Sequence, residues 1–289
     1  DQIKTYSNIT ITITTASGYV LTQTFDLTVT ASSATIISAG FNHSCAVLDN
    51  GSAKCWGYNQ NGPLGIDNNT PNTMGDSSGE MAQLTGINLG TGRTATSISA
   101  GTQHTCALLD NNSIQCWGEG GYGQIGNGST SDQTTPVSVS SISTATAIDS
   151  GRGGNCARLS NGTINCWGVW TTACQGNSSC IDNTSPVAIS GISTADNVSK
   201  GGNSCALLSG GTVQCWGNGA SGQLGNGSTS SSSTPVSVSN ISTATAISAG
   251  ESHTCALLVD QTVKCWGQGN YGQLGYGSTS SKFSPYSVT

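Results

Sequence analysis

The sequence predicts an all-β protein, a β-propeller of four-stranded blades with an N-terminal β-hairpin extension. Three observations predict it. Two cysteines separated by nine residues and followed directly by Trp-Gly occur five times in 289 residues. The first cysteines of successive pairs lie 61, 50, 49 and 50 residues apart, and a period near 50 residues is typical of propellers and solenoids. Short apolar segments alternate with turns rich in Gly, Asn and Ser, which indicates many short strands.

Residues 1–32 are expected to form the hairpin and to serve in assembly or as a linker. Apolar residues alternate strictly on both sides of a turn expected at Ser17-Gly18, at Ile9, Ile11, Ile13, Phe25, Leu27 and Val29. An isolated two-stranded hairpin is marginally stable in water. Its apolar face therefore needs an upstream domain, its own propeller or a neighbouring subunit, the last by strand addition.

Residues 33–289 contain five repeats, each with four expected strands. In the second repeat these are residues 94–101, 104–109, 113–118 and 135–140. Adjacent apolar residues, as in "CALL" and "CW", favour sheets that are covered on both faces.

The turn between the paired cysteines predicts disulfides. A three-residue loop over 49–51, with Gly51 in the left-handed conformation, places Cys45 opposite Cys55. Opposed residues of antiparallel strands are close enough for a disulfide. Asn112 and Gln261 replace that glycine in the second and fifth repeats, and Gln261 suits the conformation less well.

Zinc sites favour cysteines two to four residues apart, so disulfides are preferred over zinc. They place the mature protein outside the cytoplasm, in the extracellular space or on the cell surface. The expected pairs are Cys45–Cys55, Cys106–Cys116, Cys156–Cys166, Cys205–Cys215 and Cys255–Cys265.

The segments "HTCALL", "CWG", "GQIG" or "GQLG", and "TPVSV" together resemble the regulator-of-chromosome-condensation repeat. The form with cysteines is that of bacterial and archaeal extracellular proteins, and the likeness runs from about Ser32 to Thr289. The resemblance implies a propeller, commonly of seven blades, and five repeats suggest five blades. Residues 284–289 would then pair with residues 33–40 to close the ring. An open arc completed by another chain is the alternative.

Two parts of the chain depart from the repeat. The third repeat lacks the Gly-Gln-Leu-Gly segment and carries an extra pair, Cys174 and Cys180, expected to form a local disulfide. The leader resembles the last two strands of an immunoglobulin-like or cadherin-like domain.

Three histidines, His43, His104 and His253, each lie two residues before a cysteine. They could face one channel, but a repeated structural hydrogen bond is the preferred interpretation. Asn155 and Asn203 stand at or near this place in the third and fourth repeats.

Asp67, Asp76 and Glu80 are weak candidates for calcium ligands. They do not match a calcium-loop pattern, so a solvated loop is preferred, and neither a metal nor a cofactor is predicted. Arg152 could pair with Asp149, although a solvated pair is the preferred interpretation.

Five tryptophans that follow a cysteine are expected to pack between blades. Four other aromatic residues lie in loops and are the candidates for a binding face: Tyr58, Tyr122, Trp170 and Tyr271.

Charge and motifs exclude several functions. With 8 Lys+Arg against 14 Asp+Glu, the chain has no basic footprint for nucleic acid or for an anionic membrane surface. No apolar run is long enough for a membrane span. No catalytic motif is present, so an enzyme is not expected.

The preferred function is a structural subunit of a cell-surface appendage, filament or layer, which self-associates through its N-terminal strands into a homopolymer or contacts an upstream domain. The alternatives are a surface adhesin that binds a glycan or a surface protein, and a secreted inhibitor or scaffold module.

Overall fold

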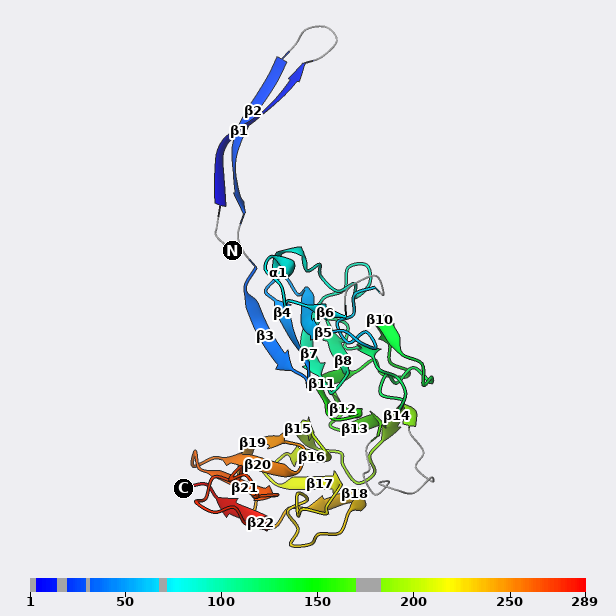
Figure 1. The fold of residues 1–289 in the computed structure, drawn as a ribbon, viewed down its shortest axis with the longest axis vertical. Helices are drawn as coiled ribbons and strands as arrows, with labels where there is room; N and C mark the ends of the chain where they lie inside the picture. The colour runs from blue at the N-terminus through cyan, green and yellow to red at the C-terminus, as the bar shows by residue number, and fades with distance from the viewer. Residues whose placement is uncertain (1–3, 15–19, 30–31, 68–71, 170–182) are drawn as a thin grey trace.

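The computed structural model describes residues 4–14, 20–29, 32–67, 72–169 and 183–289 (Figure 1). Five four-stranded antiparallel sheets follow one another as the blades of a propeller, each in simple sequential strand order. The predicted all-β propeller is thereby confirmed. Within the described ranges, the one α-helix, α1 (Glu80–Gln83), is a single turn in the insertion of the first repeat.

Each blade takes its four strands from one repeat. The first consists of β3 (Ala34–Ala39), β4 (His43–Leu48), β5 (Ala53–Tyr58) and β6 (Thr73–Met74). The second has β7 (Ala95–Ala100), β8 (His104–Leu109), β9 (Ile114–Gly118) and β10 (Gln133–Ser138), and the third β11 (Ala145–Ser150), β12 (Gly154–Leu159), β13 (Ile164–Gly168) and β14 (Asn183–Ala188). The fourth has β15 (Ala195–Lys200), β16 (Asn203–Leu208), β17 (Val213–Gly217) and β18 (Ser232–Ser237), and the fifth β19 (Ala244–Ala249), β20 (His253–Leu258), β21 (Val263–Gly267) and β22 (Lys282–Ser287).

The N-terminal hairpin consists of β1 (Lys4–Thr14) and β2 (Val20–Val29). The two strands pair antiparallel, with Ile9 opposite Phe25 and Ile13 opposite Leu21. In Figure 1 the hairpin extends away from the first blade. The turn expected at Ser17-Gly18 lies outside the described residues.

The five expected disulfides are confirmed. In every blade the two cysteines lie directly opposite on the second and third strands, with Cα atoms 4.0–4.1 Å apart. The turn residue is left-handed whether it is glycine or not, with φ of 75° at Gly51, 63° at Asn112 and 67° at Gln261. The disulfide therefore accompanies one hairpin geometry in all five blades. The sixth expected pair, Cys174–Cys180, lies outside the described residues.

The predicted closure of the ring by a shared blade is wrong. β3 pairs with β4, and β22 pairs with β21. The insertion of the first repeat supplies β6, in which Thr73 and Met74 pair with Tyr58 and Gly57, so the first blade needs no strand from the C-terminus. The blades form an arc whose first and fifth members lie at opposite ends (Figure 1).

The hydrophobic core is divided into clusters between consecutive blades. The disulfide of one blade packs together with the tryptophan and the first-strand Ile or Val of the next. Cys106 and Cys116, for example, share a cluster with Ile148 and Trp167, and the same arrangement recurs at the other junctions. Truncating a buried Phe or Trp to Ala typically costs about 3–5 kcal/mol, so the packing of these tryptophans holds the blades together.

Reduction of the disulfides should lower the melting temperature by tens of degrees, because each short crosslinked loop contributes about 2–4 kcal/mol in the chain-entropy model. Calorimetry with and without reductant measures the change, and mass spectrometry of alkylated protein counts the reduced pairs. The double variant C106A/C116A, which lacks one disulfide, should show a correspondingly smaller decrease. An unchanged melting temperature after complete reduction contradicts a stabilising role.

Candidate functional site

Consecutive blades are joined by a tryptophan that binds the loop between the third and fourth strands of the blade before it. Trp117 Nε1 donates to the carbonyl oxygen of Pro63 at 2.9 Å. Trp167 and Trp266 donate in the same way to Gln124 and Gln223, both at 3.0 Å. The loop carbonyl and the indole thus form one recurring connection. Trp216 Nε1 is buried without an acceptor among the described residues, and the corresponding part of the third repeat, residues 170–182, lies outside them.

The side chain two residues before the first cysteine of each pair forms a second connection between blades. His43 Nε2 lies 2.8 Å from Thr105 Oγ1 of the next blade, and His104 Nε2 lies 2.8 Å from Asn155 Oδ1. In the fourth blade, Asn203 Nδ2 donates to Thr254 Oγ1 at 3.2 Å. These side chains bridge blades, as the structural interpretation expected. Burial lowers the pKa of His43 and of His104 to about 4, so both are neutral at pH 7.

The innermost strands supply a third connection. Ser38 Oγ accepts a hydrogen bond from Ala100 N at 2.9 Å, and Ser199 Oγ accepts one from Ala249 N at 3.0 Å. Asp149 takes the place of this serine in the third blade.

Asp149 is a partly buried carboxylate that links three blades. It accepts hydrogen bonds from Ser99 Oγ at 3.3 Å, from Ser199 Oγ at 3.1 Å and from Lys200 N at 2.8 Å. Burial raises its pKa, although these hydrogen bonds act in the opposite direction. Lys200 is buried beside it and donates from Nζ to Gly201 O at 2.9 Å, and burial lowers the pKa of Lys200 to about 8.

The hypothetical pair of Arg152 with Asp149 is not formed. Arg152 Nη1 lies 2.9 Å from Glu251 Oε1, in an exposed ion pair between the third and fifth blades. Exposed ion pairs stabilise little. Arg158 of β12 donates hydrogen bonds to Ala195 O of the fourth blade and to Thr146 Oγ1 of its own blade.

The two end blades expose side chains that are buried in the blades between them. Ile37 of β3 is 80% exposed. Its counterparts in the other first strands are between 4 and 9% exposed, namely Ile98, Ile148, Val198 and Ile247. At the other end, Leu257 and Val288 are each 40% exposed.

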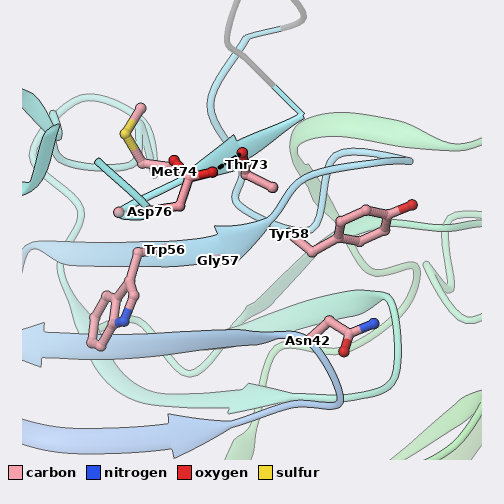
Figure 2. Close-up of a pocket in the computed structure, with 8 residues that line it drawn as sticks. Asn42, Trp56, Gly57, Tyr58, Thr73, Met74 and Asp76 are labelled. Atoms are coloured by element: carbon pink, nitrogen blue, oxygen red, sulfur yellow. Dashed lines mark hydrogen bonds between the residues drawn. The ribbon is translucent and has the colours of Figure 1, made fainter.

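A hollow of about 470 Å³ lies on the open face of the first blade. Figure 2 shows Trp56 and Tyr58 of β5 on one side of it, with Met74 and Asp76 opposite. Trp56 is only partly buried, whereas Trp117, Trp167, Trp216 and Trp266 are fully buried. The lining residues are Asn42, Trp56, Gly57, Tyr58, Thr73, Met74, Gly75 and Asp76.

Exposed aromatic residues gather in the loops that follow the first and third strands. Phe41 is 75%, Tyr122 51% and Tyr271 87% exposed. Tyr58, at the end of β5, is partly exposed. Trp170 lies outside the described residues. The sequence gives no repeated signal for Phe41, because the equivalent loop positions of the other repeats carry Thr102, Arg152, Gly202 and Glu251.

The candidate calcium ligands are engaged by the loop itself. Asp76 accepts a hydrogen bond from Thr73 Oγ1 at 2.8 Å, which lowers the pKa of Asp76. Glu80 accepts from the backbone N–H groups of Gly75 and Ser77, and Asp67 is exposed. Among the described residues, no three His, Cys, Asp or Glu side chains lie together as a metal site requires. In the same part of the chain, no helix has the length and apolar character needed to span a membrane.

Two family models described as regulator of chromosome condensation (RCC1) repeat match the chain. One matches residues 113–157, 210–257 and 262–289, and the other residues 34–62, 95–124 and 244–273. Together the matched segments cover more than half of the chain. The chain belongs to the RCC1 repeat family.

Solved RCC1-type structures share the fold. Human WBSCR16 has a TM-score of 0.75 and 20% identity, over 89% of this chain and 67% of its own. Prp20p of Saccharomyces cerevisiae has a TM-score of 0.75 and 17% identity, over 89% of this chain and 64% of its own. The ultraviolet-B receptor UVR8 of Arabidopsis thaliana is 30% identical over 100 residues, which are 35% of this chain and 21% of UVR8.

The buried histidines should make stability fall with acidification. Their folded pKa of about 4 lies below the ordinary value of 6.5. The unfolded chain therefore binds protons between these values that the folded chain does not. Stability is complete above pH 6.5 and is lost toward pH 4, by on the order of 2–3 kcal/mol for each histidine.

Urea unfolding at pH 7.5 and pH 4.5 measures this loss. The variant H43N/H104N is the matched control, because asparagine occupies the same place in the fourth blade as Asn203. It should lose several kcal/mol less than the original chain over this interval. An equal loss of unfolding free energy in both proteins would contradict the conclusion that His43 and His104 cause the acid sensitivity.

Proposed function

We propose that this RCC1-type propeller is an extracellular, non-enzymatic module that binds a protein partner through the loops following the first and third strands of its blades. Together these loops form one surface, the loop face. The exposed aromatic side chains of the loop face, Phe41, Tyr122 and Tyr271, carry the proposal.

The three aromatic residues share one side of the propeller by topology. Successive strands of a blade run in opposite directions, so the ends of the first and third strands point the same way. Phe41 follows β3, Tyr122 follows β9 and Tyr271 follows β21. Large aromatic side chains supply contact area at low conformational cost and are enriched in protein interfaces.

The comparisons support a binding role of this kind. Yeast Prp20p is described by its binding to Gsp1p and histones, and it also forms a complex with Kap60. These partners belong to that protein. The five disulfides of the present chain favour an oxidising compartment instead, so we expect an extracellular protein partner.

Assembly into a filament through β1 and β2 is a separate hypothesis. The hairpin is paired as the sequence predicts, and none of the contacts between described residues indicates a homopolymer. The exposed loop residues favour a heterologous partner, and glycan binding is a further alternative that the same experiment tests.

The triple variant F41S/Y122S/Y271S should lose binding to extracellular proteins of the source organism by roughly tenfold or more. Partners captured by the original chain are identified after crosslinking, and their affinity for each variant is then measured with purified protein. The matched control is V259S, because Val259 is 67% exposed in the hairpin after β20, on the opposite side of the propeller.

Both variants should retain the melting temperature of the original chain, since all four side chains are exposed. Equal affinity of the triple variant and the original chain contradicts the proposal, as does an equal loss in V259S. A glycan array with specific hits that the triple variant abolishes would assign the loop face to a glycan instead of a protein.

A further inference from the structure

We propose that the turns between the second and third strands of the first three blades are acceptor sites for N-linked glycans. These turns are the blade tips, residues 49–52, 110–113 and 160–163, and their acceptor residues are Asn50, Asn111 and Asn161. N-linked glycans are attached during secretion. The sites therefore rest on the extracellular location proposed above, and not on the identity of the protein partner.

Each blade tip carries the sequence that directs N-glycosylation. The three tripeptides read NGS at residues 50–52, NNS at residues 111–113 and NGT at residues 161–163. Asparagine, then any residue except proline, then Ser or Thr is the acceptor sequence in surface loops of secreted proteins. All three asparagines are exposed in the folded chain.

The turn holds the carboxamide of each acceptor in one orientation. The asparagine Oδ1 accepts a hydrogen bond from the backbone N–H two residues on, at 2.9 Å for Asn50, 3.2 Å for Asn111 and 3.1 Å for Asn161. The hydroxyl groups of Ser113 and Thr163 donate to the same oxygen, each at 2.7 Å. Because the oxygen is held in this way, Nδ2 is the outer end of the carboxamide, and among the described residues nothing accepts a hydrogen bond from it.

The same turn forms in the fifth blade without an amide. Asp260 Oδ1 accepts hydrogen bonds from the backbone N–H and the hydroxyl of Thr262, at 3.0 and 2.7 Å. The fourth blade has Gly210 and Gly211 in this turn. The fold therefore does not require asparagine at the blade tips, and the amide nitrogen is the group that the first three blades add.

Three other sequons of the described propeller residues are anchored in the core by their middle residue. Its side chain is 4–5% exposed in each of them. These are the sequons at Asn42, Asn197 and Asn240, with His43, Val198 and Ile241 in the middle. The blade tips have glycine or the exposed Asn112 at that position, so their acceptors are not tied to the core.

The sequons at Asn127 and Asn226 take part in contacts between blades. Both asparagines are partly buried. The N–H of Gly128 donates to Thr184 O of the next blade, and the N–H of Gly227 donates to Phe283 O, each at 2.8 Å. A glycan attached beside these contacts would crowd the neighbouring blade, so we expect both sites to remain unmodified.

The modification is a group transfer from an oligosaccharide that is linked through a diphosphate to a membrane lipid. Asparagine Nδ2 attacks C1 of the first sugar, and a C–N bond forms. The bond between C1 and the diphosphate oxygen breaks, and the lipid diphosphate leaves with the electron pair. The amide loses one proton to a base of the transferase.

Glycans on the blade tips cover the side of the propeller opposite the loop face. The tips follow the second strands β4, β8 and β12, which run antiparallel to the first and third strands. The exposed aromatic residues of the loop face therefore stay uncovered.

Secretion of the full chain from a eukaryotic cell line tests the sites. Release of the glycans by peptide-N-glycosidase in heavy-oxygen water converts each modified asparagine to a labelled aspartate, which peptide mass spectrometry locates. The label should be present at Asn50, Asn111 and Asn161 and absent from Asn127 and Asn226. Its absence from the three blade tips, in cells that fully modify a co-secreted reference glycoprotein, overturns the proposal.

Exchanging aspartate and asparagine provides matched variants. N50D, N111D and N161D should each lose one glycan and keep the melting temperature, because Asp260 forms the same turn with a carboxylate. D260N should gain one glycan, whereas D260N/T262A, which lacks the hydroxyl of the acceptor sequence, should gain none. Failure of D260N to gain a glycan would show that this turn does not present an acceptor and would contradict the proposal.

Partner binding is measured separately from the glycans. N50D/N111D/N161D should bind a captured partner as tightly as the original chain. A tenfold loss of affinity would place the blade tips in the interface and contradict the loop face, even with all three glycans found. Unmodified blade tips together with binding that depends on Phe41, Tyr122 and Tyr271 would contradict the glycan sites and leave the proposed function standing.

Discussion

The contact on which this fold depends is that between the tryptophan of one blade and the disulfide of the blade before it. A four-stranded sheet cannot bury both of its faces by itself, so each blade needs neighbours. The disulfide fixes the central hairpin of one blade, and the indole packs on it while its N–H anchors the loop of the same preceding blade. The repetition of cysteine, tryptophan and glycine follows from this one interface.

Two charged residues, Asp149 and Lys200, distinguish the first strands of the third and fourth blades from those of the other blades. Asp149 stands where the other first strands have a serine, and its carboxylate accepts hydrogen bonds from the second and fourth blades. This side chain therefore connects three consecutive blades. Lys200 is buried beside it instead of a small residue. Asp149 and Lys200 lie in the innermost strands, where hydrogen bonds between blades recur. We therefore assign this pair to the stability of the arc and assign binding to the exposed loops.

Much of the architecture could be predicted because its signals are local. The spacing of Cys45 and Cys55 specifies opposed positions on a hairpin, and Gly51 supplies the left-handed turn residue. The open arc could not be predicted in this way. It depends on β6, a two-residue strand within an insertion, and on which repeat supplies the fourth strand of the first blade. The aromatic loop residue Phe41 and the links of Asp149 likewise lack a repeated pattern.

The exchange rates of the tryptophan indole N–H groups test the account most directly. Two-dimensional NMR of the intact chain, with signals assigned by single Trp→Phe variants, measures each rate. The account predicts slow exchange for Trp117, Trp167 and Trp266, whose N–H groups bind loop carbonyls, and exchange roughly a hundredfold or more faster for Trp56. Protection of Trp56 equal to that of the other three would contradict an open first blade.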